Sequence, residues 1–208
     1  MIALIDYGMG NLASVAKALE TVGGRVRLVA DPAAVSGCSG VLLPGVGNFG
    51  DGMKNLAARG WTEFLREYAA RDLPFLGICL GMQMLFDASE EAPGVRGLGI
   101  VPGGVRLFPP GPGKVPHMGW NSMHVVTPAP RGLAAVAAPD EFFYFVHSFY
   151  VAPDDASWIG GVTEYNGVAF AAAVARGKLT ATQFHPEKSQ KPGLAILRSF
   201  VELCDEAR

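Results

Sequence analysis

Short apolar segments alternate with amphipathic segments through the first part of the chain. The apolar segments predict strands at residues 2–5, 26–29, 41–43 and 74–78. The segments between them show the spacing of a helix that buries one side, and they predict helices at residues 12–22, 51–71 with a break near Gly60, and 80–86. Because the strands have no polar face, the alternation predicts a mostly parallel sheet with helices on both faces.

The second part of the chain has a different pattern. Residues 92–132 are rich in proline and glycine and are expected to form loops with short strands. Closely spaced strand signals then follow at residues 142–146, 158–163, 168–174 and 179–184, and a last helix is expected at 192–206. We therefore predict one α/β domain over residues 1–208, with an antiparallel section toward its C-terminal end.

Composition excludes several classes of protein. Of 208 residues, 50% are hydrophobic and 17% are charged, which argues against a disordered chain or a coiled coil. The formal net charge of -2, without a basic cluster, argues against binding to nucleic acid or to an anionic membrane. The three cysteines are far apart and the N-terminus has no basic leader, so a reducing cytoplasmic location is expected.

Two glycine-rich turns resemble dinucleotide-binding motifs. Residues 8–13 match G-x-G-x-x-A and residues 45–50 match G-x-G-x-x-G, each after a predicted strand. Such turns are common where a parallel strand leads into a helix, so two matches in one chain weaken both. The alternatives at this point are a nucleotide-binding module and two tight turns at the ligand-binding edge of the sheet.

Cys79 has the sequence context of an activated nucleophile. The segment Gly77-Ile78-Cys79-Leu80-Gly81 joins a predicted strand to a predicted helix, as in a nucleophile elbow with cysteine in place of serine. The sharp turn requires small flanking residues, and the helix N-terminus favours a thiolate. The N–H of Leu80 is then available to an oxyanion. The alternative is a buried structural cysteine.

A thiolate nucleophile requires a base, and His185 is the first candidate. His185 and Glu187 flank Pro186 at the end of a predicted strand, so the carboxylate is placed to orient the imidazole. The other histidines are alternatives for the base, although none has an acid two residues away. A metal site at Cys79, His185 and Glu187 lacks an obvious fourth ligand. The alternative bases are His117, His124 and His147.

These two segments resemble the class I glutamine amidotransferases, and the resemblance spans nearly the whole chain. It implies a flavodoxin-like fold and a Cys79-His185-Glu187 triad that hydrolyses L-glutamine. Further segments are similar to one branch of the family, the glutaminase subunits of imidazole glycerol phosphate synthases. These segments are residues 6–11, 43–53, 115–121 and 146–150.

The resemblance also implies roles for residues outside the triad. It implies an oxyanion hole at Val46 and Leu80, and a glutamine site at Gly47, Gln83, Ser148 and Phe149. It further implies a surface that contacts a synthase partner. The residues of that surface would be Asn11, Ser14, Met118, Trp120 and Lys188.

The implied activity is ammonia production for a partner subunit. Glutamine would be hydrolysed to glutamate, and the ammonia would pass to a cyclase subunit that makes imidazole glycerol phosphate and an aminoimidazole carboxamide ribotide in histidine biosynthesis. The two subunits would form a heterodimer, and the glutaminase step would need no cofactor or metal. The alternatives are a glutaminase serving another synthase and a stand-alone thiol hydrolase acting on glutamyl substrates.

Overall fold

The structure is a computed structural model that describes residues 1–138 and 141–207. The predicted unit over residues 1–208 thus includes three positions, 139, 140 and 208, that lie outside the described residues. Its strands are β1 Ile2–Ile5, β2 Val26–Val29, β3 Gly40–Leu43, β4 Phe75–Ile78, β5 Ala88–Ser89, β6 Gly103–Leu107, β7 His117–Ser122, β8 His124–Val125, β9 Phe142–His147, β10 Phe149–Pro153, β11 Ile159–Tyr165, β12 Val168–Arg176 and β13 Leu179–Thr182. Its helices are α1 Leu12–Thr21, α2 Phe49–Ala58, α3 Trp61–Ala70, α4 Leu80–Gln83 and α5 Gln190–Glu206, with 3-10 turns η1 Pro32–Val35, η2 Arg131–Val136, η3 Ala156–Trp158 and η4 Pro186–Lys188.

The main sheet has a parallel half and a mostly antiparallel half. Strands β2, β1, β3, β4 and β13 lie side by side in that order and are parallel. Strands β12, β10 and β6 continue the sheet in antiparallel fashion, and β5 closes it parallel to β6. Strands β11 and β8 extend from β12, whereas β7 and β9 form a separate antiparallel pair. The predicted fold class, including the antiparallel C-terminal section, is confirmed.

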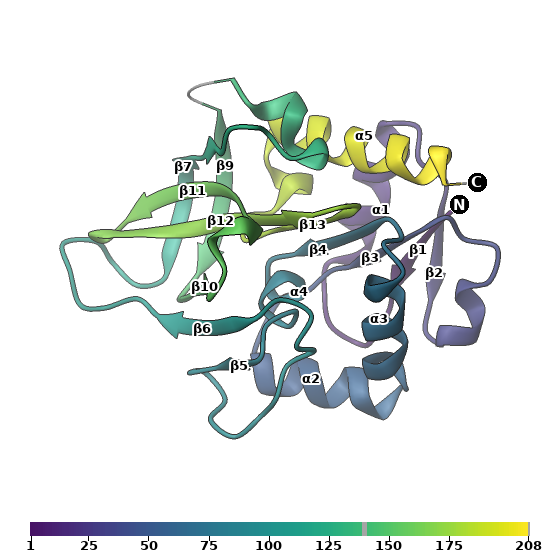
Figure 1. The fold of residues 1–208 in the computed structure, drawn as a ribbon, viewed down its shortest axis with the longest axis horizontal. Coiled ribbons are helices and arrows are strands. Elements are labelled where there is room, and N and C mark those ends of the chain that lie inside the picture. The colour runs from purple at the N-terminus through teal and green to yellow at the C-terminus, as the bar shows by residue number, and fades with distance from the viewer. Residues whose placement is uncertain (139–140, 208) are drawn as a thin grey trace.

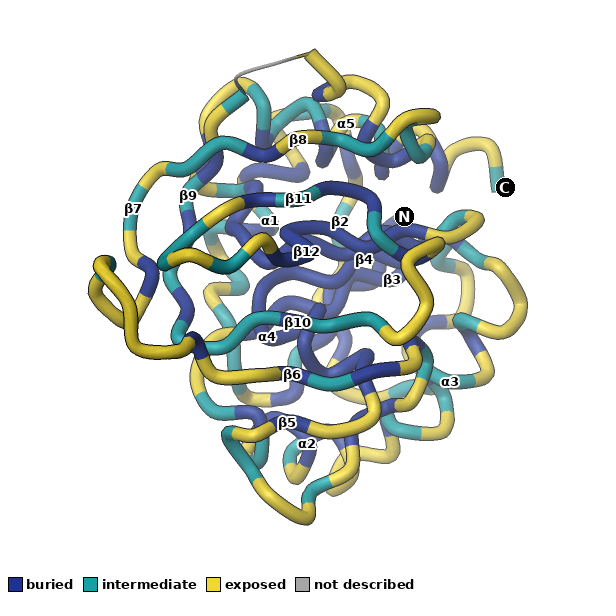
Figure 2. Tube along the Cα trace, turned by 60° about the vertical axis from the view of Figure 1, so that its left-hand side comes forward, coloured by how far each residue is buried: buried dark blue, intermediate teal, exposed yellow. Residues whose placement is uncertain are grey.

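Helices cover both faces of the parallel half (Figure 1). One core lies between the sheet and helices α2 and α3. A second core lies on the opposite face, under α1 and α5. The central strands β1, β3, β4 and β13 are buried along their whole length, because both faces are covered (Figure 2).

Several predicted elements differ in detail from the observed ones. Strand β2 is an edge strand rather than a fully buried one, and Leu28 on it is exposed. The helix predicted at residues 80–86 ends at Gln83. Strand β10 was not predicted, because the segment Phe149–Pro153 is short, contains a proline and alternates only weakly in burial. It pairs on both sides, with β12 and β6, so tertiary pairing rather than local pattern defines it.

Among residues 1–138 and 141–207, no helix is both long enough and apolar enough to cross a lipid bilayer.

Helix α5 approaches the turn η4 so closely that only glycine fits at the contact. A Cβ atom on Gly193 would lie 2.0 Å from the carbonyl oxygen of Pro186. In an ordinary helix, replacing glycine by alanine stabilises the fold by about 0.5–1 kcal/mol. Here we expect Gly193→Ala to destabilise the protein by about 1–3 kcal/mol, because the backbone of η4 has to move. Urea unfolding measures the difference.

The matched control for this prediction is Gly104→Ala. A Cβ atom at Gly104 would lie 3.7 Å from the nearest atom, the oxygen of Ala88, which is an ordinary contact. This variant is expected to unfold within about 0.5 kcal/mol of the wild type. A Gly193→Ala protein as stable as the control would refute the close approach of α5 to η4.

Candidate active site

The site forms where two neighbouring parallel strands end at the same edge of the sheet. In the β4–β13 ladder, Ile78 pairs with Thr182, so Cys79 and Gln183 are the first residues beyond the pair. The N–H of Cys79 donates to the carbonyl oxygen of Thr182 at 2.7 Å. The carboxyl edge of a parallel sheet is where open α/β folds bind their ligands.

Cys79 occupies a strained backbone conformation. Its φ of 55° and ψ of -110° lie in a region that a residue with a side chain rarely adopts. The flanking glycines make this turn possible. A Cβ atom on Gly81 would lie 2.1 Å from the oxygen of Leu43, and one on Gly77 would lie 3.0 Å from Cβ of Ala181. Such a strand-turn-helix is the geometry of a nucleophile elbow.

The elbow leaves backbone donors at the start of α4. Leu80 is the first residue of this helix, and the first N–H groups of a helix have no intrahelical acceptor. The N–H of Leu80 therefore has no acceptor within the helix, and its part in an oxyanion hole stays a prediction. Because α4 is so short, its dipole adds little, and the local N–H groups provide the positive potential.

His185 is held by Glu187 inside the protein. Its Nδ1 lies 2.8 Å from Oε1 of Glu187, and both side chains are almost completely buried. The carboxylate accepts the hydrogen bond, so Nδ1 carries a proton. Nε2 of His185 makes no hydrogen bond of standard geometry to the described residues, although the ring borders the same cavity as Cys79.

The surroundings of His185 favour its charged form. Burial alone would lower its pKa, but the Cys79 sulfur and the Glu187 carboxylate outweigh burial and raise the pKa to about 9. At neutral pH the ring is therefore an imidazolium. A cation beside a thiol favours the thiolate, and a proton on this ring is available to a leaving group.

Cys79 and His185 open into one small cavity of about 280 Å³. This volume is at the lower end of the range for ligand pockets. The residues that line this cavity include the predicted nucleophile and base and the predicted oxyanion and substrate residues. Glu187 does not line it, because its carboxylate bonds Nδ1 of His185. Its lining residues are Val46, Gly47, Cys79, Leu80, Gln83, Glu91, Pro116, Val146, His147, Ser148, Phe149 and His185.

The segment after β3 is fixed at one end. The hydroxyl of Tyr7 donates to the carbonyl oxygen of Pro44 at 3.0 Å, and Tyr7 is fully buried. Gly47 has a φ of 105°, a conformation that favours glycine. The two glycine-rich turns contact each other, since a Cβ on Gly10 would lie 3.4 Å from Pro44. The two turns therefore pack against each other at this edge of the sheet.

Three of the cavity residues were not predicted as site residues, and a fourth, His147, was predicted only as an alternative base. Glu91 accepts a hydrogen bond from the N–H of Phe49 at 2.7 Å, which places its carboxylate beside the start of α2. Its sequence context, a loop rich in acids, gives no signal of this position. The others lie on or beside the β7–β9 pair, whose place beside the cavity only the tertiary fold defines. The four are Glu91, Pro116, Val146 and His147.

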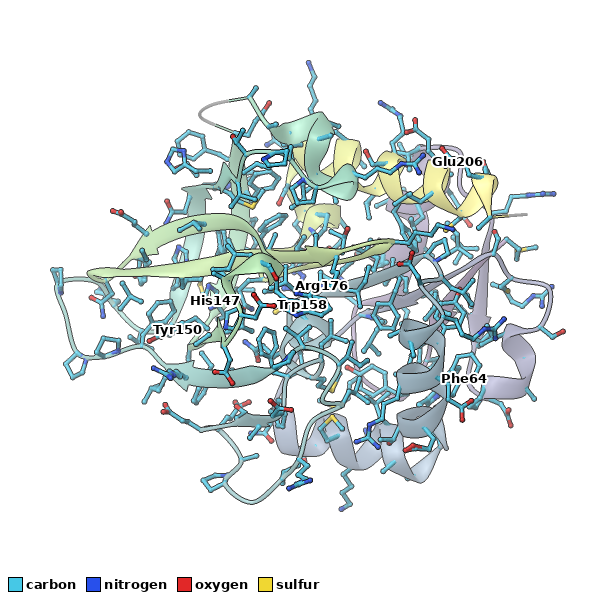
Figure 3. All side chains as sticks on the ribbon, in the orientation of Figure 1. Phe64, His147, Tyr150, Trp158, Arg176 and Glu206 are labelled. Carbon is cyan, nitrogen blue, oxygen red and sulfur yellow. The ribbon has the colours of Figure 1, made fainter. Side chains whose placement is uncertain are left out.

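Two alternative bases, His117 and His147, form a neutral buried pair. Nδ1 of His147 lies 2.8 Å from the oxygen of Phe149, and its Nε2 lies 3.0 Å from Nδ1 of His117. The ring of His147 is buried and contacts Phe170 on β12 (Figure 3). Burial lowers the pKa of His117 to about 4 and that of His147 to about 3. Both nitrogens of His147 are thus occupied, and the third alternative, His124, is exposed on β8.

Three of the five residues predicted to contact a partner lie together in one exposed patch. Met118 and Trp120 are exposed on β7, with exposed fractions of 63% and 48%. Trp120 makes an edge contact with Tyr144 on β9, and Nζ of Lys188 lies 5.9 Å from the centre of the same ring. These three side chains form one patch beside the cavity.

Asn11 and Ser14 lie at the start of α1. The Asn11 side chain caps this helix by accepting from the N–H of Ser14 at 3.3 Å. Asn11 is exposed and Ser14 is half-buried. Because α1 contacts η4, the helix borders the segment that carries Lys188.

In the described part of the chain, no three His, Cys, Asp or Glu side chains are grouped as ligands of a metal ion. Cys79, His185 and Glu187 instead form a chain, because Glu187 bonds the far side of the imidazole.

The class of protein follows from this site and from sequence comparison. The arrangement of Cys79, His185 and Glu187 at the carboxyl edge of the sheet is the one that the resemblance implies. The sequence profile of the family described as glutamine amidotransferase class-I matches residues 3–203. The chain therefore belongs to the class-I glutamine amidotransferase family.

Curated relatives narrow the comparison within the family. The chain is 48% identical over 206 residues to the imidazole glycerol phosphate synthase subunit HisH of Moorella thermoacetica, covering 99% of this chain and 96% of the relative. It is also 48% identical to the protein of that name from Synechococcus sp. strain JA-3-3Ab, covering 97% and 93%. The resemblance to this synthase subunit is confirmed.

Solved structures support the fold. A crystal structure titled glutamine amidotransferase superimposes with a TM-score of 0.73 at 20% identity, covering 99% of this chain and 100% of that chain. The glutaminase domain of Trypanosoma brucei CTPS with bound acivicin gives a TM-score of 0.70 at 20% identity, covering 99% and 93%.

The neutral histidine pair has a measurable effect on stability. Below pH 6.5 the unfolded histidines take up protons that the buried ones take up only near pH 4 and pH 3. The unfolded state then binds more protons, so the free energy of unfolding falls as the pH falls. Replacing His117 in the variant His117→Asn should reduce this slope between pH 4.5 and 6 by about 1 kcal/mol per pH unit.

Urea unfolding at several pH values measures the slope. The exposed histidine provides the control, and His124→Asn is expected to leave the slope as in the wild type. An unchanged slope in His117→Asn would mean that His117 is protonated in the folded protein, contrary to the pair as described.

Proposed function

We propose that this chain is the glutaminase subunit of an imidazole glycerol phosphate synthase, built as a single amidotransferase domain over residues 1–208 and acting in the cytoplasm. The observation that carries the proposal is the strained Cys79 elbow sharing one cavity with the His185–Glu187 pair. Relatives named as this synthase subunit, at 48% identity over nearly the full length, support the choice of synthase.

The reaction begins with attack by Cys79 on the side-chain carboxamide of L-glutamine. A bond forms between Sγ and the amide carbon, and the carbonyl electrons move to its oxygen. His185 donates the proton from Nε2 to the leaving nitrogen, and ammonia departs as the C–N bond breaks. Water then cleaves the thioester with His185 acting as base, and glutamate is released. Glu187 orients the ring and stabilises its charge.

The oxyanion forms beside the start of α4. Leu80 contributes its N–H there, and a second donor comes from the peptide at Val46, which borders the cavity from the other side. Gly45 and Gly47 make a rotation of this peptide sterically easy. Tyr7 holds the carbonyl oxygen of Pro44 and so limits the rotation to the residues that follow.

The cavity also has groups that can bind the α-ammonium group and the other polar atoms of glutamine. Glu91 brings a negative charge that complements the α-ammonium group of glutamine. Gly47, Gln83, Ser148 and Phe149 surround the remaining space, and their backbone and amide groups bind the polar atoms of the substrate. Every group needed for hydrolysis comes from the chain itself, so the proposal includes no cofactor or metal.

The product ammonia passes to a cyclase subunit bound in a heterodimer. The exposed patch of Met118, Trp120 and Lys188 beside the cavity supports a docking surface there, with Asn11 and Ser14 at its border. A partner covering this patch receives ammonia without release to water. Imidazole glycerol phosphate and an aminoimidazole carboxamide ribotide are the products of the complex, in histidine biosynthesis.

The first test concerns the nucleophile. Cys79→Ala is expected to abolish glutamine-dependent synthesis by the complex while ammonia-dependent synthesis continues, because only ammonia production needs the thiolate. Cys38→Ala is the matched control, since Cys38 lies outside the cavity, and it should retain both activities. Glutamine-dependent turnover near the wild-type rate in Cys79→Ala would refute the mechanism.

The second test concerns coupling between the subunits. If the Val46 peptide of the isolated chain directs its carbonyl toward the cavity, the oxyanion lacks one donor. One missing donor lowers the rate by about 10²- to 10³-fold. We therefore expect a slow glutaminase alone, and a faster one in the complex with its nucleotide ligand bound at the cyclase site.

The measurement is the glutaminase rate of the isolated chain, of the complex, and of the complex with ligand. The same rates are measured for Trp120→Ala, a variant in the docking patch. It should weaken activation by the partner without changing the basal rate. Equal rates in all three states would indicate a stand-alone hydrolase.

A further inference from the structure

A chain of amide hydrogen bonds leads from the backbone of β10 to the nucleophile. Nε2 of Gln83 lies 3.0 Å from the carbonyl oxygen of Phe149 and 3.1 Å from Oε1 of Gln183. Nε2 of Gln183 lies 3.8 Å from Sγ of Cys79. Gln183 is completely buried and Gln83 is nearly so, which leaves little room for either amide to turn toward water.

The direction of each bond in this chain is fixed by chemistry. A backbone carbonyl only accepts, so Gln83 must present its NH₂ group to Phe149. The second hydrogen of that group points to Gln183, which must therefore present its oxygen to Gln83. The NH₂ group of Gln183 is then directed at the sulfur of Cys79. The opposite orientation would place two NH₂ groups against each other and an oxygen against a thiolate.

The carbonyl oxygen of Phe149, at which this series of hydrogen bonds begins, also accepts from a second side chain. Nδ1 of His147 donates to the same oxygen of Phe149, so both lone pairs of that oxygen are used. His117 donates from Nδ1 to Nε2 of His147, and it accepts at Nε2 from the amide of Asn121 at 3.3 Å. The neutral histidine pair thereby fixes the acceptor that orients Gln83.

We propose that Gln183 is a further catalytic residue, whose amide N–H donates to the thiolate of Cys79. The inference rests on the proposed function and deepens it. A buried thiolate has few donors, and each N–H directed at it favours the charged form over the thiol. The 3.8 Å distance to sulfur is long for a hydrogen bond, but Gln183 is completely buried and Cys79 is largely so, which strengthens the interaction.

A second role for Gln183 would be purely structural, as a bridge between α4 and β13. The two roles differ in what they do to the sulfur. A bridge affects the fold and its stability, whereas a donor to the thiolate changes how fast Cys79 reacts with an electrophile. Gln183→Glu keeps the shape and the oxygen that accepts from Gln83, but it removes the donor. Gln183→Met also removes the donor and adds no charge.

The experiment measures alkylation of the isolated chain by iodoacetamide at pH 7. A bond forms between the thiolate sulfur and carbon as iodide leaves, and peptide mass spectrometry gives a separate rate for each cysteine. We expect Cys79 to react at least tenfold more slowly in Gln183→Met and more slowly still in Gln183→Glu. Thr180→Val, a change at a buried polar residue of β13, the strand that ends just before Gln183, should leave the Cys79 rate as in the wild type.

Cys38 provides an internal control because it is half-buried and distant from the cavity. Its rate should be unchanged in every variant. The proposal is wrong if Cys79 reacts at the wild-type rate in both Gln183 variants, or if it slows only where the Cys38 rate also changes. Should Gln183→Glu fail to fold, Gln183→Met decides. Because alkylation needs neither glutamine nor partner, this outcome is independent of the Cys79→Ala test.

Discussion

The parallel pairing of β4 with β13 is the constraint on which the site depends. Cys79 and Gln183 are 104 residues apart in the chain, yet the register of this pair makes them neighbours at one edge of the sheet. The edge stays compact because Gly81 lets α4 start directly against the oxygen of Leu43. The pairing of Ile78 with Thr182 thus places Cys79 beside Gln183, at the cavity that His185 also lines.

Two histidines line the same cavity, and their surroundings shift their pKa values in opposite directions. His185 has a carboxylate on one side and the sulfur on the other, so its pKa rises to about 9. His147 has uncharged hydrogen-bond partners and aromatic neighbours such as Phe170. Burial lowers its pKa to about 3, and the nearby His117 and His185 rings act in the same direction. The charged ring is suited to proton transfer. The neutral ring is suited to holding a backbone carbonyl in place, because its two nitrogens act as one donor and one acceptor.

The β7–β9 pair connects the surface with the interior. One face carries the exposed Met118 and Trp120. His117 and His147 are paired in the same ladder but are buried, and His147 bonds the carbonyl oxygen of Phe149. A partner that docks on the exposed face therefore contacts strands that also hold the wall of the cavity. Arg176 lies over the buried ring of Trp158, 4.0 Å from its centre, and neither residue lines the cavity (Figure 3).

The sequence by itself determined the strands with no polar face, the elbow around Cys79 and the His185–Glu187 pair, because each depends on residues a few positions apart. It also determined the family, since the motifs around these residues are specific. Only the tertiary structure decided that β10 exists, that His147 and Glu91 border the cavity, and that Gln183 points at the sulfur. These features depend on strand register and on hydrogen-bond direction between distant segments, and neither leaves a periodic signal in the chain.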